Sequence, residues 1–97
     1  MSTASPTGGV LCSCVQGARQ HVPNLPKGNA EDFEPNTTPA RGVLVLFLYA
    51  DGVHHIAYVD ELSSEGFHVQ HYNKKRCQHT EEWIGWNDSS IKGFYKP

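Results

Sequence analysis

Residues 43–62 read VLVLFLYADGVHHIAYVDEL, and this stretch predicts the centre of the fold. Residues 43–49 form an apolar run rich in β-branched and aromatic side chains, which is typical of a buried strand. Asp51-Gly52 is a strong signal for a tight turn, so a second strand over residues 54–62 should pair with the first in antiparallel fashion. The stretch therefore predicts a β-hairpin.

The segments on either side of this hairpin complete the predicted domain. After a turn at residues 63–66, the pattern favours a third strand over residues 67–73 and a last strand over residues 91–95. Before the hairpin, Ser13 can cap a helix over residues 14–21, which the following prolines end. We therefore expect an α+β domain with an N-terminal helix packed on an antiparallel β-sheet.

Composition places the chain among ordinary globular proteins. It has 97 residues, 38% of them hydrophobic and 19% charged, with a net charge of −2, which does not suggest nucleic-acid binding. We expect a flexible tail at residues 1–10 and a single domain over residues 11–97. The first residues lack the basic start and apolar run of a signal peptide, so we expect synthesis in the cytoplasm. No apolar run approaches the roughly 20 residues of a membrane helix.

The three cysteines, Cys12, Cys14 and Cys77, are too few and too odd in number for a disulfide framework. A reactive thiol or a metal site fits them better. One alternative is therefore a small zinc module, with His79 as the fourth ligand. Its weakness is spacing, because the Cys12 and Cys14 thiolates would share one ion across a one-residue gap.

Cys14 and His55 are candidates for a nucleophile and its base. A cysteine that opens a helix, followed by a histidine that opens a strand, is the layout of papain-type enzymes. The helix N-terminus and the His55 imidazolium should lower the pKa of the Cys14 thiol, whereas Cys12 should titrate as a free thiol. Strand alternation predicts that His55 and Ala57 share one face, and small Ala57 should let the helix approach there.

The third strand offers a candidate partner for His55. His71 and Asn73 share one face of that strand, so either could hold the imidazole ring, as the third member of a catalytic triad does. We favour Asn73, because an amide oxygen is a fixed acceptor while His71 would need the right tautomer. The candidate catalytic residues are therefore Cys14, His55, Asn73 and His71.

Together these segments resemble the CHAP domain (cysteine, histidine-dependent amidohydrolase/peptidase) of bacterial and phage peptidoglycan hydrolases. That family usually presents Glu-x-Asn where this chain has His71-Tyr72-Asn73, so an acidic partner is missing there. The similar segments, in chain order, are Ser13-Cys14-Val15 with Ala18-Arg19, Gly28-Asn29-Ala30, residues 39–47, residues 55–59, residues 69–73, and residues 91–94 with Pro97.

The resemblance implies a papain-like fold and cleavage of an amide bond in peptidoglycan, by an N-acetylmuramoyl-L-alanine amidase or by a peptidoglycan endopeptidase. No metal or cofactor is required, and the resemblance implies action on the cell wall after release or as part of a virion. The expected partners are peptidoglycan and other phage or virion proteins, with no nucleic acid, no membrane span and a monomeric chain. The other alternative is a non-catalytic CHAP-like virion structural or binding domain, because a fold does not guarantee its chemistry.

Overall fold

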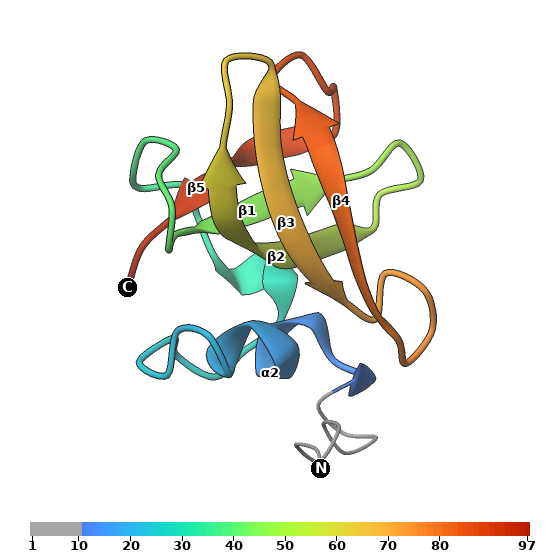
Figure 1. Ribbon diagram of the computed structural model, residues 1–97. Coiled ribbons are helices and arrows are strands. Elements are labelled where there is room, and N and C mark those ends of the chain that lie inside the picture. The colour runs from blue at the N-terminus through green and yellow to red at the C-terminus, as the bar shows by residue number, and fades with distance from the viewer. Residues whose placement is uncertain (1–10) are drawn as a thin grey trace, which may run out of the picture.

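The computed structural model describes residues 11–97, so the predicted tail at residues 1–10 lies outside the described residues. The described strands form one antiparallel sheet in the order β4-β3-β2-β1-β5 (Figure 1). The elements are the α-helix α2 (Cys14–Arg19), the 3-10 helix η1 (Ala30–Asp32) and the strands β1 (Leu44–Leu48), β2 (His54–Leu62), β3 (Gly66–Tyr72), β4 (His79–Gly85) and β5 (Ile91–Tyr95).

The predicted hairpin is confirmed. β1 and β2 pair in antiparallel register, with Phe47 opposite His55. In the turn between them, Gly52 adopts a φ of 86°, a left-handed conformation that favours glycine. Asp51 Oδ1 accepts a hydrogen bond of 3.1 Å from the backbone N–H of Val53. The third and last strands also lie where the pattern predicts them.

β4 is a strand that the hydrophobic pattern does not reveal. It lies at an edge of the sheet, and Ile84 is its only buried residue. Its other side chains are mostly polar or exposed, so it lacks the apolar alternation that marks a half-buried strand. With this strand and a helix of only six residues, the described chain is mostly β, rather than the more balanced α+β domain that we expected.

The sheet curves strongly, so that one of its faces encloses a core. Phe67 of β3 and Phe94 of β5 pack edge to face, with 5.3 Å between ring centroids, although two strands separate them in the sheet (Figure 1). We call this the inner face. Its buried apolar residues are Val43, Val45, Phe47, Ala57, Val59, Phe67, Val69, Ile84 and Phe94.

Helix α2 covers the opposite, outer face, where it lies beneath the sheet in Figure 1. The prediction that the helix would approach the sheet at Ala57 is therefore wrong. Ala57 belongs to the inner face, which the curvature of the sheet already fills, and Ile56 offers the helix an apolar surface on the other side. The buried apolar residues of the outer face are Val15, Ala18, Leu25, Ala30, Phe33, Leu44, Leu46 and Ile56.

Gly17 allows α2 to lie close to β3. A Cβ atom at Gly17 would stand 2.0 Å from Cγ of Tyr72, so any side chain there would collide with the tyrosine ring. The Tyr72 hydroxyl continues to the end of the helical segment, where it lies 2.8 Å from His21 Nε2. This contact holds the C-terminal end of the helix beside the end of β3.

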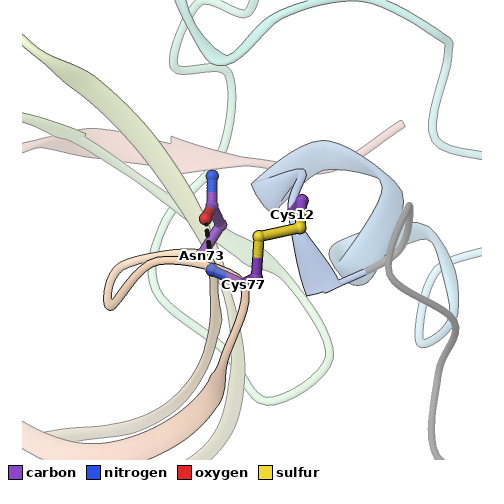
Figure 2. The surroundings of a disulfide bond; sticks show 3 residues. All are labelled: Cys12, Asn73 and Cys77. Carbon is purple, nitrogen blue, oxygen red and sulfur yellow. Dashed lines mark hydrogen bonds between the residues drawn. A yellow bond between two sulfur atoms is a disulfide. The ribbon is translucent and has the colours of Figure 1, made fainter.

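A disulfide joins Cys12 to Cys77, across a sequence separation of 65 residues (Figure 2). The prediction that these cysteines do not pair is wrong, because residue counting cannot show that the fold brings the start of α2 against the β3–β4 turn. A cross-link closing a loop of this length stabilises the folded chain by about 4 kcal/mol in the chain-entropy picture. The bond also removes the proposed zinc module and the free Cys12 thiol, since neither sulfur remains available as a ligand.

Candidate functional site

His55 lies on the inner face and is only 5% exposed. Its ring packs against Phe47 and Tyr49, with centroid separations of 5.9 and 6.2 Å. Its Nε2 atom lies 2.9 Å from Nδ1 of His71, which is fully buried on the neighbouring strand. Because Ala57 stands opposite His71 in the register, His55 reaches the His71 ring diagonally across the two strands.

Glu82 of β4 extends this contact into a chain of three side chains. Its Oε2 atom lies 2.7 Å from Nε2 of His71, and the same oxygen accepts a hydrogen bond from Lys74. Glu82 stands opposite Val69, which places it on the inner face beside His71. We call the chain His55–His71–Glu82 the inner network.

The environment of the inner network determines its charges. The pKa of His55 is lowered to about 3, mainly by burial, and repulsion by a protonated His71 and by Lys74 acts in the same direction. Burial likewise lowers the pKa of His71. For Glu82, burial would raise the pKa, but the positive charge of Lys74 and the hydrogen bonds from Lys74 and His71 outweigh it and lower the pKa overall. At neutral pH the network therefore combines a carboxylate with two uncharged imidazoles.

These charges settle which ring nitrogens carry protons. An ionised Glu82 accepts hydrogen bonds only, so His71 donates through Nε2–H and its Nδ1 is an acceptor. That acceptor in turn requires His55 to donate through Nε2–H. The lone pair of His55 is then on Nδ1. A chain that ends on a carboxylate thus leaves His55 Nδ1 free to accept a proton.

Cys14 is the first residue of α2 and is partly exposed. Ser13 caps the helix as predicted, with its Oγ accepting a hydrogen bond of 3.2 Å from the backbone N–H of Gln16. Burial raises the pKa of the Cys14 thiol, while hydrogen bonds from the backbone of Ile56, Val15 and Cys14 itself act in the opposite direction. The prediction of a lowered pKa is therefore wrong, because loss of solvent outweighs the end of a short helix.

The thiol of Cys14 lies against the strand that carries His55, but on the other side of it. The backbone of Ile56, the residue after His55, contacts the thiol, and Cys14 packs with the outer-face cluster. The His55 ring belongs to the inner face. Within residues 11–97, no hydrogen bond joins Cys14 to His55. The structure therefore places the Cys14 thiol, at the start of α2, and the His55 ring on opposite faces of β2.

His54 and Glu82 are two candidates that the sequence reasoning did not select. Strand alternation puts His54 on the same face as Ile56, and in the described chain its buried Nδ1 has no hydrogen-bond partner. Glu82 lies on a strand that the pattern did not predict. The signal that would have predicted β4 is a two-residue alternation along residues 79–84. Its two sets are His79, Glu81 and Trp83 on one face of the strand and Thr80, Glu82 and Ile84 on the other.

Of the two candidate partners for His55, the structure brings His71 to its ring. Asn73 lies just beyond β3 with a φ of 63°, and its Oδ1 accepts a hydrogen bond of 2.7 Å from the backbone N–H of Cys77 (Figure 2). This contact holds the turn that carries the disulfide. Asn73 is therefore engaged in the β3–β4 turn rather than with His55.

A polar groove of about 280 Å³ lies beside the start of α2. Arg19 and Lys27 give it two positive charges, and Arg19 is held by a hydrogen bond of 3.0 Å from its Nε to the carbonyl of Leu25. The groove therefore offers a cationic surface next to the helix turn that carries Cys14. Its lining residues are Ser13, Val15, Gln16, Arg19, Lys27, Gly28 and Asn29.

Comparison with protein-family models, characterised proteins and solved structures finds no match to this chain. No helix within residues 11–97 is long and apolar enough to span a membrane. The function of the candidate site must therefore be inferred from the geometry of its residues.

Proposed function

We propose that the chain is a cysteine-dependent hydrolase that cleaves an amide bond in peptidoglycan, on a papain-like arrangement of helix and sheet. The observation that carries the proposal is the inner network, which ends in a free His55 Nδ1 on the strand that Cys14 contacts. Nucleophilic catalysis by cysteine requires a thiol that reaches an oriented imidazole, so in this proposal the Cys14 thiol turns from the outer side of β2 toward His55 Nδ1 when substrate binds. Contacts of this kind are often long before substrate binds.

In this proposal Cys14 transfers its thiol proton to His55 Nδ1 and attacks the carbonyl carbon of the amide. The resting thiol is neutral, because burial raises its pKa, so the proton moves during attack rather than before it. Backbone N–H groups of Cys14 and Val15 already contact the sulfur and would stabilise the oxyanion that forms. His55 then protonates the leaving amine, and a water molecule that His55 activates hydrolyses the acyl-enzyme.

His71 and Glu82 act as positioning residues in this proposal. They keep the proton of His55 on Nε2 and stabilise the imidazolium that forms when Nδ1 takes up the thiol proton. Glu82 thus supplies the acidic partner that the CHAP family places on the third strand, but from the adjacent strand β4 and through His71.

The substrate class follows from the resemblance and is supported by two features. The groove with Arg19 and Lys27 suits a ligand that carries carboxylates, as the peptides of peptidoglycan do. The disulfide between Cys12 and Cys77 suits a protein that works in an oxidising environment such as the cell exterior.

The test is to digest purified sacculi and to identify the released fragments by mass spectrometry. Cys14→Ser and His55→Ala should each lower the rate of release by at least about 100-fold, the scale of lost general acid–base catalysis. Fragments that carry a new amino terminus on L-Ala would identify an amidase, and new termini within the peptide would identify an endopeptidase.

His54→Ala is the matched control, because it removes the neighbouring imidazole from the other face of the same strand. It should retain activity. If His54→Ala abolishes release while His55→Ala does not, the base is His54 and the inner network has no part in catalysis. If the wild-type protein releases nothing but sediments with sacculi, the chain is a non-catalytic wall-binding domain.

A further inference from the structure

A second carboxylate–imidazole network lies on the outer face, in the part of the sheet beyond the helix. His68 of β3 stands between two acidic side chains from its neighbouring strands, Asp60 of β2 and Glu81 of β4. One ligand atom from each of the three lies within 4.8 Å of the others. We call the group Asp60–His68–Glu81 the outer network.

The proton on His68 is determined by Asp60. Asp60 Oδ1 lies 2.7 Å from His68 Nδ1, so the ring donates through Nδ1–H and, when neutral, presents the lone pair of Nε2. That lone pair faces Oε1 of Glu81 at 3.7 Å. Two acceptors that face each other across such a gap leave room for a cation that binds both of them.

The width of this gap fits a metal ion. Nitrogen and oxygen ligands bind Zn²⁺ at about 2.0–2.2 Å, which in a tetrahedral site separates two ligand atoms by roughly 3.4 Å. The distance of 3.7 Å from His68 to Glu81 is close to this value and is too long for a hydrogen bond. A ligating histidine whose other ring nitrogen donates to a carboxylate is also the usual arrangement around zinc.

Surrounding residues hold these ligands in place. Gln70 donates to Asp60 Oδ2 at 2.9 Å, and His79 lies 3.0 Å from the Gln70 side-chain oxygen. The ring of Trp83 packs edge to face on His68, with centroids 5.1 Å apart. A cleft of about 240 Å³, lined by Asp60, Glu61, His68 and Trp83, opens beside the network, so an ion could enter from solvent and keep water ligands.

We propose that the outer network is a binding site for a divalent transition-metal ion such as Zn²⁺, with His68 Nε2 and the Glu81 carboxylate as ligands and Asp60 as the group that orients His68. The site uses no residue of the proposed catalytic machinery. It does not depend on whether the chain hydrolyses peptidoglycan.

The test is a titration of the full chain with ZnCl₂ by isothermal calorimetry, in a Cys14→Ser background that removes the free thiol as a competing ligand. One equivalent of Zn²⁺ should bind, and His68→Ala should abolish binding. Glu81→Gln should weaken it at least about 10-fold, and Asp60→Asn about 10- to 100-fold, as expected for loss of an orienting partner.

Glu61→Gln is the matched control, because Glu61 lines the same cleft but is not part of the outer network. It should bind Zn²⁺ as the parent does. In a ¹⁵N-edited spectrum of the imidazole rings, Zn²⁺ should shift Nε2 of His68 and not the nitrogens of His79. No binding, or equal binding by the parent and His68→Ala, would overturn the proposal, and an equal loss with Glu61→Gln would show non-specific attraction to acidic groups.

Discussion

The inner and outer networks use the same three strands and the same kinds of side chain, but on opposite faces of the sheet. The inner network is His55–His71–Glu82, and the outer network is Asp60–His68–Glu81. The central histidine side chain is 1% exposed on the inner face and 20% exposed on the outer face. The two networks therefore differ more in the solvent exposure of their histidines than in the types of side chain that form them.

This difference in exposure determines which role a network of carboxylates and imidazoles can have on each face of the sheet. Inside the sheet, loss of solvent keeps the imidazoles neutral and gives each proton one position, which suits an orienting device. On the outer face, the same groups remain open to water and ions, which suits ligand binding.

Removal of the central histidine should lower the free energy of unfolding substantially on the inner face only. His71→Ala leaves a cavity and removes a partner from both His55 and Glu82, so the free energy of unfolding should fall by about 3 kcal/mol. His68→Ala should cost less than about 1 kcal/mol, because its ion pairs are partly solvated. Urea unfolding at pH 7.5 measures both values. Equal losses would show that the outer network is as structural as the inner one.

The inner network should also make stability depend on pH. The folded pKa of His55 is lowered to about 3 from an ordinary value of 6.5, so protons bind the unfolded chain more strongly. The contribution of neutral His55 to the free energy of unfolding is therefore fully present above pH 6.5 and is lost as the pH falls toward 3. From pH 6.5 to 5.5 this loss amounts to about 1 kcal/mol for His55, and the lowered pKa of His71 adds to it in the same direction.

Urea unfolding at a series of pH values measures this slope. His55→Gln, which gains no proton in this range, should flatten the slope between pH 6.5 and 5.5. An unchanged slope in His55→Gln would mean that other groups, such as His21, whose pKa burial also lowers, account for the acid sensitivity.

The smallest expected change in the free energy of unfolding comes from substituting Glu81 and Glu82, two consecutive residues that face opposite sides of β4. Glu82→Gln replaces the charged partner of His71 and should cost about 1 kcal/mol, the scale of one hydrogen bond. Glu81→Gln, on the outer face, should change the free energy of unfolding by less than about 0.5 kcal/mol in metal-free buffer. Thermal unfolding of the two variants side by side provides the measurement. A larger effect for Glu81 than for Glu82 would contradict the assignment of faces.

The sequence predicted the parts of the fold whose signals are local. The hairpin over residues 43–62 is confirmed, because an apolar run, a turn dipeptide and a second strand adjoin in the chain. Ser13 was correctly predicted as a helix cap from residue type alone. Alternation also predicted that His55 and Ala57 share a face. β4 escaped prediction because an edge strand that buries one side chain carries little hydrophobic pattern.

The sequence by itself therefore determined four of the five strands, the turn between β1 and β2, and which side chains share a face, since these depend on neighbours in the chain. Only the tertiary structure decided which face the helix covers, which cysteines pair and which residue meets His55. Which face the helix covers depends on how strongly the sheet curves, and residues distant in sequence, such as Phe67 and Phe94, pack together inside that curve. The disulfide and the His55–His71 contact likewise join residues from separate elements. Alternation assigns residues to two faces, but only three-dimensional packing decides which face is filled by the sheet itself.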